Sequence, residues 1–300
     1  MDLPSASNAG WRHPLYVDGP ESINPITREV NLLEHRTSAE PWRRLLESDA
    51  DVALLQEATE PPHEVVSKVG IDAEPWLTEG AGAPRPWRTA VVQLTNRVRV
   101  EWLKPFRIFE ASGGDLAVSR LGTLSAAKVI APDGKSVLLA SMYGLWEKPH
   151  SSTGSSWIYA DASVHRVISD LAGLIGQQNG HNILAAGDLN ILHGYGEGGN
   201  AYWGGRYATV FARMSAMGVP FVGPQAPNGR RADPWPTELP PDSANVPTFY
   251  TTHAAPETAA RQLDFVFASV AMSTRVRVRA LNAPDQWGPS DHCRVEIEID

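Results

Sequence analysis

Short stretches in which apolar residues alternate with polar ones, or run together over a few positions, recur along this chain and predict β-strands. The segment DVALLQE is an apolar run that ends in Glu57, and NILAAGDLN is a second apolar run that ends in Asp188 and Asn190. Both have the length of a buried strand. Each therefore places a carboxylate at the carboxyl end of a strand.

Further strands are predicted along the rest of the chain, and two longer segments are interpreted as strand pairs. The second pair has the turn PDGK, in which Asp133 and Gly134 supply hairpin chemistry. The segments are RTAVVQLTNRVRVEWL and SAAKVIAPDGKSVLLASMYG for the pairs, then PTFYTT, RQLDFVFAS, RVRVRAL and the final run from Cys293 to Asp300.

An arginine stripe in RVRVRAL alternates with apolar positions, as Glu296 and Glu298 do in the final run. We interpret the stripe as the solvated face of an antiparallel strand that pairs with these glutamates. A nucleic-acid track is the less favoured alternative.

Apolar residues at spacings of three and four predict three helices. The first is capped by Ser38, the second runs from about Asp161 to Ile175, and the third lies in YWGGRYATVFARMSAMG. A helix precedes the strand in both DVALLQE and NILAAGDLN, which suggests two similar layers that deliver both acids to one edge. The apolar faces comprise Trp42, Leu45 and Leu46; Val164, Ile168, Leu171, Leu174 and Ile175; and Val210, Phe211, Met214 and Met217.

The composition favours one soluble domain. The chain has 300 residues, of which 42% are hydrophobic and 20% charged, and no break in composition divides it. We expect an irregular lead-in at 1–25, a single domain at 26–300 and an irregular, proline-rich loop at 223–247. No signal peptide or membrane-spanning run is visible, so we expect a cytoplasmic, monomeric protein. The single cysteine, Cys293, argues against disulfide and redox chemistry.

The net charge of −8 argues against binding nucleic acid mainly through a broad basic surface. Any polyanionic substrate would need a local attraction, such as a metal ion.

Four acids stand at or beside the ends of predicted buried strands: Glu57, Asp188, Asp264 and Asp291. Each alone could simply cap a turn. If they converge, two carboxylates about 4 Å apart repel by about 4 kcal/mol at an effective dielectric of about 20, unless a cation or bound protons neutralise them. Clustered oxygen ligands without cysteine suit Mg²⁺ or Mn²⁺ rather than structural zinc.

In this order, DVALLQE, GDLN, QLDFVFAS and SDH resemble the signature of the endonuclease/exonuclease/phosphatase superfamily, the metal-dependent phosphoesterases related to deoxyribonuclease and apurinic-site endonucleases. The resemblance extends from about Asn31 to the C-terminus. It implies a four-layered α/β sandwich, in which helices flank two central mixed β-sheets and the active site lies at one edge between the sheets.

The resemblance also implies a role for each residue of these motifs. Glu57 is similar to the family's metal-binding glutamate, with Asn31 and Asp291 near it. Asp188 resembles the acid that orients or deprotonates the attacking water, and Asn190 the amide that holds this water or a phosphate oxygen. His292 resembles the imidazole that contacts the scissile phosphate, Asp264 its orienting carboxylate, and Tyr143 a phosphate-contacting tyrosine.

The first family motif departs from its usual form. Family members usually begin with an apolar strand that ends in Trp-Asn, whereas Asn31 follows Glu29 and Val30 here. Asn31 is the preferred candidate for this position, and the alternative is that it caps a turn.

Residues in two loops are weaker candidates for contacting substrate. Tyr195, Tyr202, Trp203 and Arg206 follow GDLN and could line a cleft, although a flexible surface loop is the slightly preferred interpretation. Arg230 and Arg231 in the proline-rich loop could clamp a substrate phosphate or could simply be solvated.

The expected activity is metal-dependent hydrolysis of a phosphoester by an activated water, with a nuclease or nucleic-acid phosphodiesterase preferred. The alternatives are an enzyme that acts on inositol phosphates, lipids or small nucleotides, and a non-hydrolytic binding module of the same fold.

Overall fold

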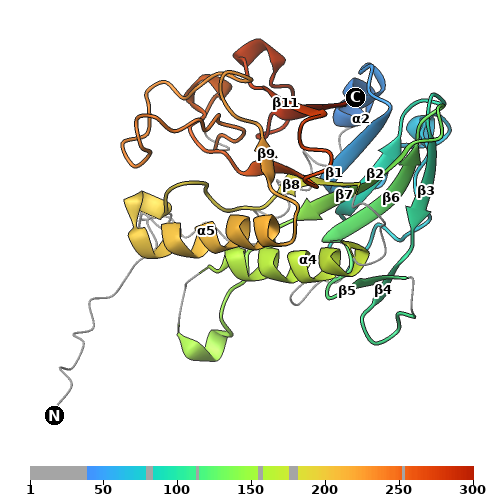
Figure 1. Cartoon of the computed structure of the whole chain (residues 1–300), viewed down its shortest axis with the longest axis horizontal. Coiled ribbons are helices and arrows are strands. Elements are labelled where there is room, and N and C mark those ends of the chain that lie inside the picture. The colour runs from blue at the N-terminus through green and yellow to red at the C-terminus, as the bar shows by residue number, and fades with distance from the viewer. Residues whose placement is uncertain (1–38, 79–83, 113–114, 155–157, 176–181, 252–253) are drawn as a thin grey trace.

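The computed structural model describes residues 39–78, 84–112, 115–154, 158–175, 182–251 and 254–300 (Figure 1). The predicted lead-in, the cap residue Ser38 and the candidate Asn31 lie outside the described residues.

A six-stranded mixed sheet forms the centre of the molecule. The hairpin between β6 and β7 turns at PDGK as predicted, with Gly134 at φ 83°. The pair β7–β8 is parallel and the other pairs are antiparallel, so the sheet is mixed. In spatial order the strands are β3 (Arg99–Leu103), β6 (Leu124–Ile130), β7 (Ser136–Tyr143), β8 (Ile183–Asp188), β10 (Asp264–Ala268) and β9 (Phe221–Gly223).

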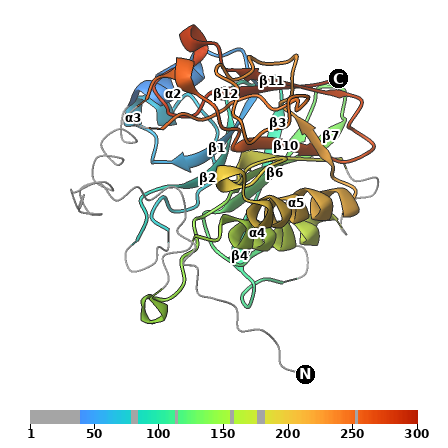
Figure 2. The same cartoon turned by 90° about the vertical axis from the view of Figure 1, so that its left-hand side faces the viewer.

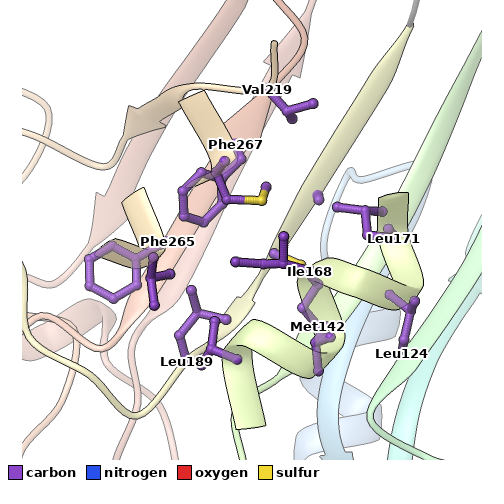
Figure 3. Close-up of a cluster of buried hydrophobic side chains, with 14 of the residues drawn as sticks. Leu124, Met142, Ile168, Leu171, Leu189, Val219, Phe265 and Phe267 are labelled. Atoms are coloured by element: carbon purple, nitrogen blue, oxygen red, sulfur yellow. The ribbon is translucent and has the colours of Figure 1, made fainter. Parts of the chain in front are cut away.

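Two long helices, α4 (Ala160–Ile175) and α5 (Ala201–Ala216), lie side by side on one face of this sheet (Figures 1 and 2). Asn200 caps α5 by accepting hydrogen bonds from the backbone N–H groups of Tyr202 and Trp203. The hydrophobic core beneath the helices includes Met142, Ile168 and Phe265 (Figure 3).

The opposite face of the sheet packs against two antiparallel strand pairs. These are β1 (Val52–Ala58) with β2 (Arg88–Gln93), and β11 (Val276–Leu281) with β12 (Arg294–Ile299). Successive side chains of a strand point to opposite faces, and the two cores divide accordingly. In β10, for example, Phe265 and Phe267 pack under the helices, whereas Val266 and Ala268 pack between the sheet layers.

The short helices α2 (Ala39–Leu46) and α3 (His63–Val66) cover the outer side of β1 and β2, where Trp42 is buried against them (Figure 2). The layers are therefore helices, sheet, strand pairs and helices. The predicted four-layered α/β sandwich is confirmed, with two antiparallel strand pairs in place of a second mixed sheet. A small parallel pair, β4 (Pro105–Arg107) with β5 (Leu116–Val118), lies beside α4 (Figure 1).

One predicted strand pair is wrong. RTAVVQLTNRVRVEWL forms two strands, β2 and β3, but β2 pairs with β1 and β3 pairs with β6. The two strands lie in different layers. The indole N–H of Trp102 in β3 donates a hydrogen bond across the layers to the carbonyl oxygen of Val91 in β2. The arginine stripe follows the preferred interpretation, since Arg277 and Arg279 form ion pairs with Glu298 and Glu296 across the β11–β12 pair.

Within the part of the chain that the structure describes, we find no helix with the length and apolar character needed to cross a membrane.

Strands β7 and β8 approach so closely at Gly187 that only glycine fits. A Cβ atom added there would lie 1.8 Å from the carbonyl oxygen of Met142. We expect Gly187→Ala to lower the free energy of unfolding by about 3 kcal/mol or more, because the backbone of one of the two strands must move. Urea denaturation measures this loss.

Gly205→Ala is the matched control, because Gly205 lies in α5 with open space around it. This change should stabilise the protein by about 0.5–1 kcal/mol, as expected for replacing glycine in an exposed helix. Equal effects of the two substitutions would contradict the packing described here.

Candidate active site

Three polar residues form a row across the ends of neighbouring strands of the central sheet. Asp188 at the end of β8 pairs in register with Tyr143 at the end of β7 and with Asp264 at the start of β10. All three side chains face the layer that contains the strand pairs. Residues two positions apart in a strand point to the same face, and the residues two positions away from these three belong to the core between the layers or contact β1. Strand register and alternation thus bring these residues to one edge of the sandwich.

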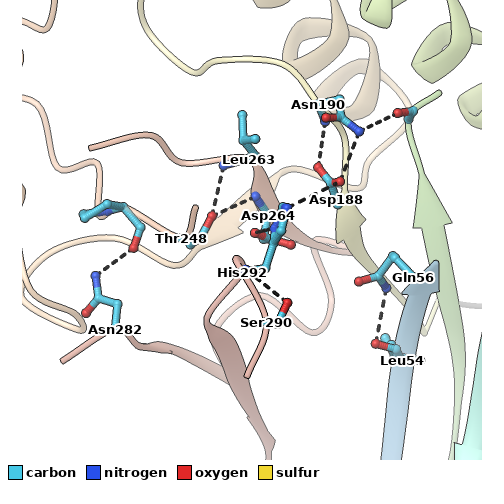
Figure 4. A network of polar contacts seen from close by, with 12 residues as sticks. Leu54, Gln56, Asp188, Asn190, Thr248, Leu263, Asp264, Asn282, Ser290 and His292 are labelled. Carbon is cyan, nitrogen blue, oxygen red and sulfur yellow. Dashed lines mark hydrogen bonds and ion pairs between the residues drawn. The ribbon is translucent and has the colours of Figure 1, made fainter. Parts of the chain in front are cut away.

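A tight turn after β8 holds Asp188 and Asn190 together. The backbone N–H of Asn190 donates to Asp188 Oδ1 at 2.9 Å, and its side-chain amide donates to Asp188 Oδ2 at 3.1 Å (Figure 4). The same amide donates to the carbonyl oxygen of Gly144 at 2.9 Å. Asn190 has φ 52°, a left-handed conformation that asparagine tolerates better than most residues. The GDLN motif therefore orients the Asp188 carboxylate.

His292 reaches the row from the segment that precedes β12. Its Nδ1 lies 2.8 Å from Asp264 Oδ2 and its Nε2 lies 3.9 Å from Asp188 Oδ2. The Ser290 hydroxyl accepts from the backbone N–H of His292 (Figure 4). The ring of Phe249 packs 5.0 Å from the imidazole. The imidazole thus lies between the two carboxylates.

Charge and burial act in opposite directions on this group of residues. Burial lowers the pKa of His292, but the carboxylates of Asp264 and Asp188 raise it by more, so the pKa lies well above its ordinary value. Burial raises the pKa of Asp188 above the usual aspartate range; the charge of His292 opposes this shift and that of Asp264 adds to it. We conclude that His292 is cationic at neutral pH and that Asp188 is a stronger base than an exposed aspartate.

Glu57 approaches the same edge from β1. It has φ 48° at a point where the pairing of β1 with β2 shifts register, so the strand is bulged there. The Tyr143 hydroxyl donates to Glu57 Oε1 at 2.5 Å, and the ring of Trp87 packs edge-on against Tyr143 at 5.2 Å. The bulge and the tyrosine together fix the glutamate at the junction between the two sheet layers.

The residues at this edge fit a divalent cation. Carboxylate oxygens of Asp188 and Asp264 lie within 4.8 Å of each other, beside the imidazolium of His292. The charge of Glu57 helps to raise the pKa of Asp188, and that of Asp291 helps to raise the pKa of His292, so both further acids lie within electrostatic range. A set dominated by carboxylate oxygens matches hard cations such as Mg²⁺.

The aromatic residues predicted to line a cleft after GDLN pack around the start of α5. Trp203 is only 8% exposed and belongs to the core under the helices, between Tyr159 and Tyr207. Tyr195 packs against the same core, where burial raises the pKa of its hydroxyl.

Arg206 lies over the rings of Tyr159, Tyr202 and Trp203 and forms a 2.6 Å ion pair with the buried Asp161. These contacts join the first turns of α4 and α5.

Arg230 and Arg231 hold the proline-rich loop, which has no regular secondary structure in residues 224–247. The Arg230 guanidinium donates to the carbonyl oxygen of Pro256 at 3.0 Å. That of Arg231 donates to those of Pro241 and Ser243 and stacks on Trp235. The structure thus places both arginines in contacts that shape the loop.

Several residues that position the site carry no signal in the sequence. The Thr248 hydroxyl accepts from the backbone N–H groups of Leu263 and Asp264 and so fixes the start of β10 (Figure 4). Gln56 donates to the Ser141 hydroxyl, which donates to the carbonyl oxygen of Leu55. Such partners lie far apart along the chain. They could have been predicted only if it were known which strand ends face each other.

The model of the endonuclease/exonuclease/phosphatase family matches residues 31–292 of this chain. The chain belongs to this family. It is therefore a phosphoester-hydrolysing enzyme, and the resemblance drawn from the four motifs is confirmed. We found no curated protein that matches the sequence.

Solved structures of this fold are similar to the phosphoesterase at low sequence identity. The apurinic endonuclease LMAP from Leishmania major has a TM-score of 0.57 and 14% identity, with 89% of this chain and 83% of that chain covered. The 3′-5′ exonuclease NExo from Neisseria meningitidis has a TM-score of 0.53 and 15% identity, with coverage of 89% and 96%. The endonuclease domain of TRAS1, a telomere-specific retrotransposon, has a TM-score of 0.51 and 15% identity, with 89% of this chain and 94% of that chain covered.

The pairing of His292 with Asp264 predicts a pH-dependent contribution to the stability of the phosphoesterase. Because the folded pKa of His292 is raised, its stabilisation is fully present below the unfolded value of about 6.5 and is lost as pH rises through the folded value. Asp264→Asn should therefore lower the free energy of unfolding by about 1.5–3 kcal/mol at about pH 6 and by less at alkaline pH. Urea denaturation in EDTA measures both values without interference from bound metal.

Asp242→Asn, at an exposed acid in the proline-rich loop, is the control and should show no such trend. A loss for Asp264→Asn that stays constant or grows with pH would contradict the assignment of an imidazolium to this pair.

Proposed function

We propose that this phosphoesterase cleaves phosphodiester bonds of nucleic acid by attack of an activated water and that it depends on a divalent cation, Mg²⁺ or Mn²⁺. The observation that supports this most strongly is the row Tyr143, Asp188 and Asp264 with His292 between the two aspartates. This row supplies the proposed base and a fixed cationic donor, and Glu57 and Asp291 lie within electrostatic range as the proposed acidic ligands.

Asp188 is the proposed base. Water must be deprotonated or oriented as it attacks phosphorus, and a carboxyl whose pKa is raised by burial is suited to accept that proton near neutral pH. The two hydrogen bonds from Asn190 to Asp188 hold the carboxylate in one orientation. Asn190 itself is proposed to contact the water or a phosphate oxygen.

His292 is the proposed donor to the scissile phosphate. Its Nδ1 is bound to Asp264, which leaves the Nε2–H to point toward Asp188 and the space where a phosphoryl oxygen would lie. A cation held in place before the reaction stabilises negative charge as it develops and needs no reorganisation.

Glu57 and Asp291, with Asn31 from outside the described residues, are the proposed metal ligands, and Tyr143 positions Glu57 through its hydroxyl. When bound, the cation would supply positive charge to the phosphoryl oxygens and leaving group.

Nucleic acid is the preferred substrate because the structures of similar fold include an apurinic endonuclease, an exonuclease and a retrotransposon endonuclease. A panel with Mg²⁺ or Mn²⁺ tests the preference: plasmid DNA, DNA single strands, abasic duplex, RNA, inositol phosphates and sphingomyelin. We expect the highest kcat/KM on one of the nucleic acids. Turnover confined to inositol phosphates or sphingomyelin would contradict the substrate class while leaving the hydrolytic site in place.

A further inference from the structure

A group of arginines lies beside the catalytic edge, on segments that contact the strand carrying Tyr143. Arg85 forms a two-residue antiparallel bridge with Thr78, with backbone hydrogen bonds of 2.7 and 2.8 Å. Its guanidinium lies 4.6 Å above the ring of Trp87, which in turn packs against Tyr143. Contacts therefore run without a break from Arg85 to the tyrosine that holds Glu57.

Arg120 lies on the turn that precedes β6, next to the same bridge. The Thr123 hydroxyl donates to the carbonyl oxygen of Arg120, while the Thr123 carbonyl accepts from the backbone N–H of Tyr143 at 2.9 Å. Gly122 in this turn has φ 84° and packs directly against Thr78. The turn and the bridge thus present Arg120 and Arg85 to the same region.

The two guanidinium groups are close enough to repel. Burial, and then the charge of Arg120, lower the pKa of Arg85 to about 10. Burial and the charge of Arg120 also lower the pKa of Arg166, whose guanidinium pairs with Glu147. When an anion binds between two cations that are held close together, the electrostatic repulsion between them is offset and the free energy falls.

Arg120 is the member of the group whose charge is best placed for a ligand. Its side chain is half-buried, and within the described ranges its guanidinium makes no hydrogen bond or ion pair. Asp170, which contacts the adjoining Ser119, has partners of its own, since it accepts from both the backbone N–H and the hydroxyl of that serine.

An exposed ring adjoins Arg120. Arg120 and Arg107 line an open hollow of about 200 Å³ together with Phe109, which is 80% exposed. Stacking platforms next to guanidinium groups are the means by which proteins bind unpaired nucleotides, because a base within a duplex does not present its face.

We infer that Arg85, Arg120 and Phe109 form a subsite for an unpaired nucleic-acid strand, in which the arginines bind a phosphate next to the scissile one and Phe109 stacks on a base. This subsite rests on the proposed hydrolysis of nucleic acid. It explains how a chain with a net charge of −8 can attract a polyanion locally.

Binding and turnover are measured separately to test the subsite. Fluorescence anisotropy in EDTA with a labelled DNA single strand of about 12 nucleotides gives Kd. We expect Arg120→Gln and Phe109→Ala each to raise Kd about 10-fold, and Arg120→Gln to reduce the slope of log K against log salt by about 0.7. Both variants should hydrolyse bis-p-nitrophenyl phosphate, which cannot reach the subsite, within about twofold of the wild-type kcat/KM.

Arg279→Gln is the matched control, because it removes the same charge from a guanidinium paired with Glu296 on the β11–β12 pair. Its Kd should equal that of the wild type. The subsite is overturned if Arg120→Gln binds the strand as tightly as Arg279→Gln does, or if Phe109→Ala has no effect. Absence of wild-type turnover on bis-p-nitrophenyl phosphate would instead contradict the proposed hydrolysis, and the binding comparison would still decide the subsite.

Discussion

Replacing Asp188 with asparagine is expected to lower kcat for phosphodiester hydrolysis by about 10²–10⁴-fold. The amide cannot accept the proton of the attacking water, and general bases contribute about this much to enzymatic rates. The change keeps the size of the side chain, and the Oδ1 atom can still accept from the backbone N–H of Asn190. Steady-state kinetics on bis-p-nitrophenyl phosphate measure the loss.

The fold should survive this substitution. A buried carboxyl with a raised pKa is less stable in the folded protein at neutral pH than a neutral group of the same shape. Urea denaturation should therefore show cooperative unfolding of the Asp188→Asn protein with a free energy close to that of the wild type. A well-folded variant with kcat within about tenfold of the wild type would remove Asp188 from the role of base.

Replacing His292 with alanine is expected to lower kcat by about 10²–10³-fold, because the fixed cation that faces the phosphate is lost. A second effect follows from the geometry. Asp264 and Asp188 lie on opposite sides of the imidazole, at 2.8 and 3.9 Å, so its removal leaves a buried and a half-buried carboxylate without their cation. We expect the alanine variant to be less stable as well as less active.

His292→Gln separates the two effects. Glutamine can still donate a hydrogen bond from this position but carries no charge. The glutamine variant should be closer to the wild type in stability than the alanine variant is, whereas its kcat should remain low. Recovery of kcat in the glutamine variant would show that hydrogen bonding, and not charge, is what His292 contributes.

The sequence predicted the strands of this site well because their signal is local. The alternation in QLDFVFAS and LLASMYG predicts which side chains share a face. Phe265 and Val266 pack on opposite sides of β10, as this alternation predicts. The sequence alone placed Glu57, Asp188, Asp264 and Asp291 at or beside the ends of predicted strands. Their convergence depends on register, which local patterns do not specify.

Features that depend on partners distant along the chain were not predicted. Strands β2 and β3 look like a hairpin in sequence, yet each finds a better partner in β1 and β6. Trp203 looked available for substrate because it follows GDLN, but it packs into the core beneath the helices, between Tyr159 and Tyr207. Arg231 binds carbonyl groups of its own loop and Arg230 binds the carbonyl group of Pro256, outcomes that a proline-rich sequence without periodicity does not indicate.

The metal dependence of phosphodiester hydrolysis tests the central claim most directly. The purified protein should hydrolyse bis-p-nitrophenyl phosphate with Mg²⁺ or Mn²⁺, lose this activity in EDTA and regain it when the metal is restored, while Asp188→Asn remains inactive throughout. Turnover that persists in EDTA, or no turnover on any phosphoester with either metal, would contradict the proposal that this edge of the sandwich is a metal-dependent hydrolytic site.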